Sequence, residues 1–182
     1  MINRIHILGA SGSGTTTLAR KICERLGYKH IDTDDYYWVK TEPPFIQKRK
    51  PEERIKLLSE AMLSCDKWIL SGSLCGWGDV FIPLFDLVVY LWISQDIRME
   101  RLKVREFQRY GEEIKTGGKL FVSHQEFMEW ASQYDTGDLN IRSKRLHYTW
   151  LDNIPCQVMK IEEDLTIDEK FRKVETAILE SK

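Results

Sequence analysis

The stretch RIHILGASGSGTTTLARKICERL, residues 4–26, decides the fold. It starts with the short run Arg4–Leu8, whose apolar and β-branched residues predict a buried strand. It ends with Thr15–Leu26, where apolar residues recur every four positions, and Gly27 follows as a typical helix stop. A glycine-rich loop joins the two segments, so the sequence predicts a strand, a tight loop and a helix in immediate succession.

The loop has the glycine spacing of a phosphate-binding loop, Gly9-x-x-x-x-Gly14. Its glycines allow the chain to turn tightly, so that successive backbone N–H groups point into one concavity, and the following helix adds the positive end of its dipole. We expect the phosphates of a nucleotide to bind at Gly9, Ser11, Gly12, Ser13, Gly14, Thr15, Thr16 and Thr17. The alternative is an ordinary turn between a strand and a helix, which rarely combines this spacing with a hydroxyl residue at the position of Thr16.

Two threonines decide the chemistry of this loop. Thr16 stands where a hydroxyl would coordinate the Mg²⁺ that bridges the β- and γ-phosphates. Thr15 stands where such loops carry a lysine, which delivers a point charge to the same phosphates. Because the loop amides can still bind nucleotide, we expect this substitution to affect catalysis more than binding.

Strands and helices alternate along the rest of the chain. Further strands are predicted at residues 28–32, 67–71, 86–93 and 156–161. Helices are predicted from Pro51, from a cap at Ser94 to about Arg109, and from Thr166, which has capping-box spacing with Glu169. This order predicts an α/β fold with a parallel sheet covered by helices on both faces, in a single domain of residues 1–182. A glycine-punctuated insert at about 110–140, around a short helical piece at residues 124–134, is expected to be a mobile lid.

Acidic residues follow the second predicted strand, at the edge where parallel sheets bind ligands. A carboxylate at Asp34 or Asp35 could accept the proton of an attacking hydroxyl, and Asp32 could hold Mg²⁺. Alternatively, these residues only punctuate the end of a strand.

Other residues at this edge are candidates to bind the acceptor together with Asp32 and Asp34. Gly72 would admit a substrate close to the backbone, and Trp77 could stack on a base, or could equally be a core tryptophan. Tyr37 could line the same pocket or pack beneath residues 39–50.

Several features together resemble the adenylate, shikimate and uridine kinase group of P-loop kinases. They are the phosphate loop, DTDDYY after the second strand, LSGS after the third, and an arginine-rich lid. GSGTTT without a lysine also looks like the loop of some archaeal-type cytidylate kinases. The resemblance implies a three-layer P-loop kinase fold with sheet order 2-3-1-4-5, ATP with Mg²⁺, and a lid that closes over the phosphates. Asp34 matches both the D-x-D of shikimate kinases and the D-D-F-Y of uridine and nicotinamide riboside kinases, so we predict that Asp34 is the base.

Arginines border the insert on both sides, as in the resembling kinases. Four of them lie on one helix within an arc of about 80°: Arg98, Arg101, Arg105 and Arg109. Arg142 and Arg145 follow the insert. We predict that one or two of Arg101, Arg105, Arg142 and Arg145 reach the β/γ-phosphates in place of the lysine, and that Arg98 and Arg109 are solvated.

Composition sets outer limits on function. The formal net charge of −1 gives no basic field for nucleic acid or an anionic membrane, so neither is an expected partner. The four cysteines are scattered, as in reduced cytosolic proteins, and the start resembles no signal peptide, so the cytoplasm is expected. The sequence therefore predicts an ATP- and Mg²⁺-dependent kinase of a small molecule, most plausibly a nucleoside or nucleotide. The alternatives are a kinase of another alcohol and a nucleotide-binding module without turnover.

Overall fold

A five-stranded parallel sheet forms the centre of the protein, in a computed structural model that describes residues 1–181. Its strands are β1 (Arg4–Gly9), β2 (Lys29–Asp32), β3 (Trp68–Ser71), β4 (Leu87–Leu91) and β5 (Gln157–Ile161). They lie in the order β2-β3-β1-β4-β5, which confirms the predicted topology. All five residues of β4 are buried, as expected for a strand covered on both faces.

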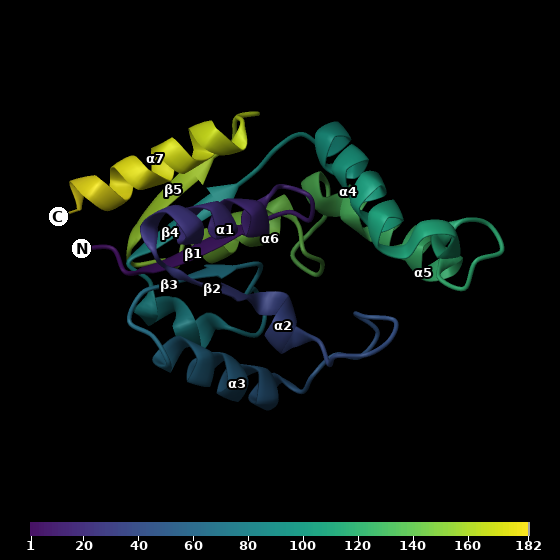
Figure 1. The fold of residues 1–182 in the computed structure, drawn as a ribbon, viewed down its shortest axis with the longest axis horizontal. Coiled ribbons are helices and arrows are strands. Elements are labelled where there is room, and N and C mark those ends of the chain that lie inside the picture. The colour runs from purple at the N-terminus through teal and green to yellow at the C-terminus, as the bar shows by residue number, and fades with distance from the viewer. Residues whose placement is uncertain (182) are drawn as a thin grey trace.

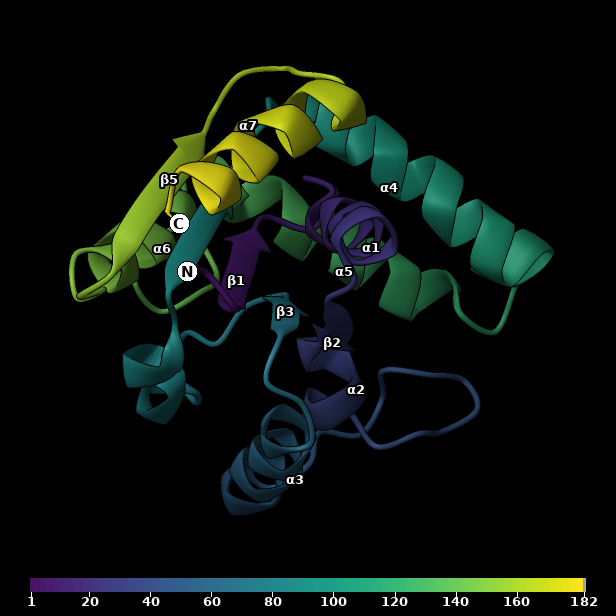
Figure 2. The ribbon, with the colours of Figure 1, turned by 60° about the vertical axis from the view of Figure 1, so that its left-hand side comes forward.

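Helices cover both faces of this sheet and make a three-layer fold (Figure 1; Figure 2). One face packs against α1 (Thr15–Leu26) and α7 (Ile167–Glu180). The other packs against α3 (Pro51–Leu63), the 3-10 helix η1 (Asp79–Leu84) and α6 (Lys144–Leu151). Each face therefore has its own apolar core. Within residues 1–181, no helix is long and apolar enough to cross a membrane.

The region after β4 extends away from the sheet (Figure 1). It consists of α4 (Gln95–Tyr110), η2 (Gly111–Ile114), α5 (Phe121–Ser132) and η3 (Gln133–Asp135). The predicted helical piece inside the insert is therefore real, although it begins at Phe121 instead of His124. Whether this region moves as a lid stays a proposal.

Some local predictions were right, and others differ from the structure. The capping box of α7 is present, with reciprocal hydrogen bonds between Thr166 and Glu169. Ser94 occupies the N-cap of α4 as predicted, but its side chain makes no capping hydrogen bond. The helix α2 (Thr33–Tyr37) was not predicted, and it begins where the Asp32 side chain accepts a hydrogen bond from the backbone N–H of Asp34. Two of the three acidic residues therefore lie on a helix and not on the strand end.

Candidate active site

Close packing or backbone conformation requires each of the three glycines of the phosphate loop. A Cβ atom on Gly9 would lie 2.3 Å from the backbone oxygen of Leu91, and one on Gly12 would lie 2.9 Å from the backbone oxygen of Arg98. Gly12 and Gly14 have φ angles of +83° and +97°, which residues with a side chain rarely adopt. The loop is thus pressed between the end of β4 and the first turn of α4.

The start of α1 offers unpaired donors. Its N-cap is Gly14, and no side chain caps the helix, so its first backbone N–H groups lack intrahelical partners. The Ser13 hydroxyl is buried and has no hydrogen-bond partner among residues 1–181. A polyanion at this position would satisfy these donors and would gain from the helix dipole, so the residues present fit nucleotide phosphates.

The two residues expected to bind magnesium lie together. The Thr16 hydroxyl donates to Oδ2 of Asp32 at 3.0 Å, and the Ser71 hydroxyl donates to the same oxygen at 3.1 Å. Nε2 of His30 lies 2.9 Å from the Ser71 hydroxyl oxygen, which fixes that side chain in turn. Hydroxyl and carboxylate oxygens are the ligands that Mg²⁺ prefers. Ser71 was not singled out in the sequence, because its proximity to Asp32 depends on the pairing of β2 with β3.

Asp34 and Asp35 are placed differently in the first turn of α2. Asp34 is an exposed residue, yet the surrounding protein desolvates its carboxyl enough to raise the pKa of that group, and the Asp32 carboxylate adds to this rise. The positive charges of Arg142 and Arg105 act in the opposite direction on the pKa of Asp34. Burial raises the pKa of Tyr36, and the negative charge of Asp35 adds to that rise. Asp34 therefore lies in the electrostatic field of both arginines.

The four arginines proposed for the transferred phosphate separate into two groups. Arg105 and Arg142 act on Asp34 from opposite ends of the insert. Arg142 also lies with its Cζ 5.4 Å from the ring centre of Trp130, and Arg105 is paired with Glu106 at 2.9 Å.

Arg101 and Arg145 are placed elsewhere. Arg101 is exposed, and its charge lowers the pKa of Lys170 on α7, after the larger effect of burial. Arg145 is exposed near Asp138, whose pKa is lowered mainly by Asn140 and to a smaller extent by Arg145. Of the four predicted arginines, Arg105 and Arg142 are thus the two whose charges act on the pKa of Asp34.

The prediction that Arg98 is solvated was wrong. Its side chain is completely buried, and Nη2 donates to Asp135 at 2.5 Å while Nη1 donates to the backbone oxygen of Ala131 at 3.3 Å. Its guanidinium also lies 5.0 Å from the ring centre of Tyr134. Arg98 therefore joins α4 to the end of the insert. Arg109 is exposed, as predicted.

One residue of the acceptor side was missed. Arg54 on α3 is only 8% exposed, and its Cζ lies 3.8 Å from the ring centre of Tyr37. Its Nε donates to the backbone oxygen of Arg49 at 2.7 Å. A signal was present in the sequence, because Arg54, Leu58 and Met62 recur every four residues on the buried face of α3.

The predicted acceptor residues Tyr37 and Trp77 lie beside Arg54. Their ring centres are 5.9 Å apart, and Arg54 lies 5.9 Å from the ring centre of Trp77. Trp77 Nε1 donates to the backbone oxygen of Ser73, so this ring is also part of the local packing. Gly72 has a packing role: a Cβ there would lie 1.8 Å from Oγ1 of Thr33, at a φ of +110°.

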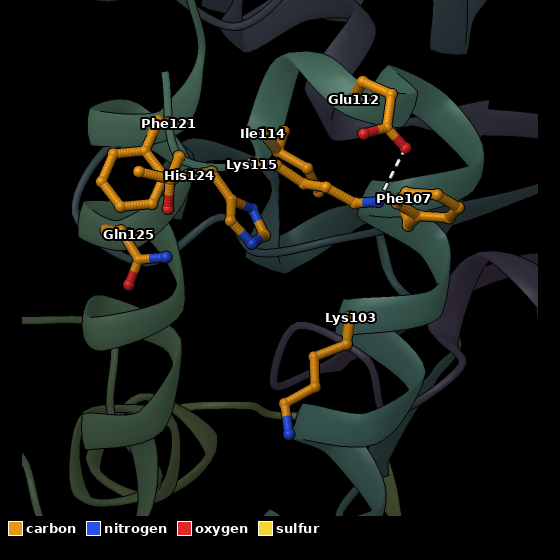
Figure 3. Close-up of a pocket in the computed structure, with 9 residues that line it drawn as sticks. Lys103, Phe107, Glu112, Ile114, Lys115, Phe121, His124 and Gln125 are labelled. Atoms are coloured by element: carbon orange, nitrogen blue, oxygen red, sulfur yellow. Dashed lines mark hydrogen bonds and ion pairs between the residues drawn. The ribbon is translucent and has the colours of Figure 1, made fainter. Parts of the chain in front are cut away.

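A separate hollow lies in the outer part of the insert (Figure 3). This cavity of about 720 Å³ lies between α4, η2 and α5, and its lining includes Lys103, Phe107, Lys115, Phe121 and His124. None of the residues predicted for the active site lines it.

Comparisons with known proteins identify the family and the fold of this chain. Residues 5–116 match the AAA domain family. The chain is 49% identical over 174 residues to the uncharacterized protein YqaC of Bacillus subtilis, with 96% of each chain covered. It is 30% identical over 119 residues to the cytidylate kinase of Methanocorpusculum labreanum, a match that covers 57% of this chain and 63% of that protein. A shikimate kinase structure from Bacteroides thetaiotaomicron has a TM-score of 0.61 at 18% identity, with 98% of this chain and 99% of the other covered. At that identity the likeness shows the fold alone, and the P-loop kinase fold is confirmed.

Proposed function

Because the chain belongs to the AAA domain family and has the P-loop kinase fold, we propose that it is an ATP- and Mg²⁺-dependent kinase of a small molecule. It transfers the γ-phosphoryl group to a nucleoside or nucleotide. The observation that carries the proposal is the placement of Asp34, which lies beside the Thr16–Asp32 pair and in the field of Arg105 and Arg142. A passive nucleotide-binding module would need the phosphate loop but none of these groups.

Asp34 has the role of general base in this proposal. It accepts the proton of the attacking acceptor oxygen, carried by a hydroxyl or by a phosphate monoanion, as that oxygen bonds to the γ-phosphorus and the bond to the β-phosphate oxygen breaks to release ADP. Desolvation raises the pKa of Asp34, and a higher pKa makes a carboxylate a better proton acceptor. Asp32 is a poorer candidate, because Oδ1 caps α2 and Oδ2 accepts from two hydroxyls.

Thr16 and Asp32 would hold Mg²⁺, which would supply positive charge to offset the negative charge of the nucleotide phosphates. The α1 amides and Ser13 bind the phosphates. Arg105 and Arg142 supply the positive charge that Thr15 lacks, and a guanidinium can bind two phosphate oxygens at once. Closure of the lid would bring Arg105 closer and exclude water.

Arg54 favours an acceptor that carries an anionic group. Its Nε is bonded to Arg49, and no hydrogen bond or ion pair from its two Nη atoms exists within residues 1–181. These two Nη atoms keep contact with solvent, so a phosphate of the acceptor could bind both of them at once. Tyr37 and Trp77 would pack against the rest of the acceptor. We therefore favour a nucleoside monophosphate over a neutral nucleoside, in agreement with the name of the archaeal relative.

The experiment is an ADP-release assay with ATP, Mg²⁺ and a panel of nucleoside monophosphates, nucleosides and sugar-like alcohols. We expect turnover with at least one monophosphate and loss of most of it in Thr16→Ala. ATP binding without turnover on any acceptor would favour the nucleotide-binding module. Turnover on a neutral alcohol alone would refute the role of Arg54.

A further inference from the structure

A buried chain of hydrogen bonds runs behind the acceptor side of the site. The hydroxyl oxygens of Tyr90 on β4 and Tyr134 in η3 lie 2.8 Å apart. The Tyr134 oxygen lies 2.8 Å from Nδ1 of His147 on α6, and His147 Nε2 lies 3.2 Å from the hydroxyl oxygen of Ser73. All four side chains are buried. Elements far apart in the sequence are thus joined through polar atoms that have little access to water.

This chain fixes the segment that carries Arg142. Arg142 directly precedes Ser143, the N-cap of α6, whose hydroxyl donates to the backbone oxygen of Asp138 at 2.5 Å. The backbone N–H of His147 donates to the backbone oxygen of Ser143 at 3.0 Å, so the imidazole projects from the same turn. Through this ring, the turn that begins beside Arg142 is tied to Ser73, at the start of the loop that holds Trp77.

A second tie holds the base of the insert. The buried Arg98 is paired with Asp135 and also donates to the backbone oxygen of Ala131. Nε1 of Trp92 donates to the other oxygen of Asp135 at 2.6 Å. Separating these groups would leave a charge buried without its partner, which is among the costlier changes a protein can undergo. Residues 131–135 are therefore held firmly to Arg98 and Trp92, although they lie inside the predicted lid.

The outer part of the insert is packed more loosely. The cavity of Figure 3 separates α4 from α5 there. On these two helices, Val104, Phe107 and Val122 are 49%, 46% and 66% exposed. Segments with few buried apolar contacts are the ones that open first. The insert is thus held firmly at residues 131–135 and is packed loosely around the cavity between α4, η2 and α5.

We propose that Tyr134 and His147 are positioning residues, which hold Arg142 against the acceptor loop through Ser73. The series Tyr134–His147–Ser73 is called the strut below. The lid then moves only between Arg98 and Ala131. Arg142 is a fixed part of the acceptor wall in the open and the closed state, whereas Arg105 lies on the moving part of α4.

The kinetic consequence rests on the proposed function, but the strut can be tested without any substrate. Tyr134→Phe removes the central hydroxyl and keeps the ring that Arg98 faces. Tyr90→Phe is the matched control, since it also removes one buried hydroxyl but leaves the strut intact. Amide hydrogen exchange is measured over residues 73–78 and 142–147 of the full chain without nucleotide. The kcat, the KM for the acceptor and the affinity for ATP follow in the presence of substrates.

We expect Tyr134→Phe to speed exchange in both segments about tenfold more than Tyr90→Phe does, because it leaves the buried Nδ1 of His147 unpaired. The kcat/KM for the acceptor should fall about tenfold with unchanged ATP affinity. Equal exchange in the two variants overturns the strut. If Tyr134→Phe does not fold, Ser73→Ala cuts the other end of the strut, and normal exchange at 142–147 in that variant overturns it too. Faster exchange in a protein that phosphorylates no acceptor supports the strut and refutes the proposed function instead.

Discussion

Two buried histidines make the stability of this protein depend on pH in a calculable way. Burial lowers the pKa of His6 from 6.5 to about 4, and its Nε2 has no hydrogen-bond partner among the described residues. Burial lowers the pKa of His147 to about 3, and the charges of Arg142 and His6 act in the same direction. Both rings are therefore neutral in the folded protein well below the pH at which they gain a proton in the unfolded chain.

The sign follows from proton binding. Between pH 6.5 and about 4, the unfolded chain binds more protons at these two positions than the folded protein, so stability is complete above 6.5 and is lost as the pH falls. Each histidine contributes about 1.4 kcal/mol per pH unit, so the fall from pH 6.5 to 5.0 costs about 4 kcal/mol for both together.

Urea unfolding at pH 7.5 and pH 5.0 measures this difference in the free energy of unfolding. In His147→Gln, which cannot take up a proton there, the difference should shrink to about half. A change below about 1 kcal/mol in the parent protein would show that these rings are not held neutral by burial, and the argument would fail.

The remaining predictions concern the phosphate site. Thr16→Ala should weaken the binding of MgATP much more than that of metal-free ATP in a titration, and equal effects would show that this hydroxyl does not bind the metal. Asp34→Asn should lower kcat by about 10²–10⁴ with nearly unchanged ATP affinity. If Asp35→Asn lowers kcat much more than Asp34→Asn does, Asp35 is the base instead. Arg142→Ala should lower kcat about 10³-fold, and adding Thr15→Lys should restore part of that loss in a double-mutant cycle. No restoration would show that the two charges act on different phosphate oxygens.

Local patterns were enough to predict most of the fold. The glycine loop, the periodic face of α1 and the capping box of Thr166 and Glu169 depend on residues within one turn of each other. The alternation of strands and helices then restricts the sheet to few topologies, and the family resemblance selected the correct one. The short helix α2 was not predicted, because a segment of five residues shows too little periodicity to indicate a helix.

Buried charges could not be predicted in the same way. Arg98 and its partner Asp135 lie 37 positions apart, and the spacing of the arginines on α4 fits an exposed face as well as a buried one. Arg54 becomes a candidate only when α3 is seen to bring it onto the ring of Tyr37. Its place on the apolar face of α3 was the one local clue.

The most direct test of the central claim is to follow the γ-phosphoryl group itself. The protein is incubated with γ-labelled ATP, Mg²⁺ and each nucleoside monophosphate, and the products are separated by chromatography. We expect label in a nucleoside diphosphate, and at least about 10²-fold less of it with Asp34→Asn. Label that stays in ATP, or that is found only in inorganic phosphate with every acceptor, would contradict it.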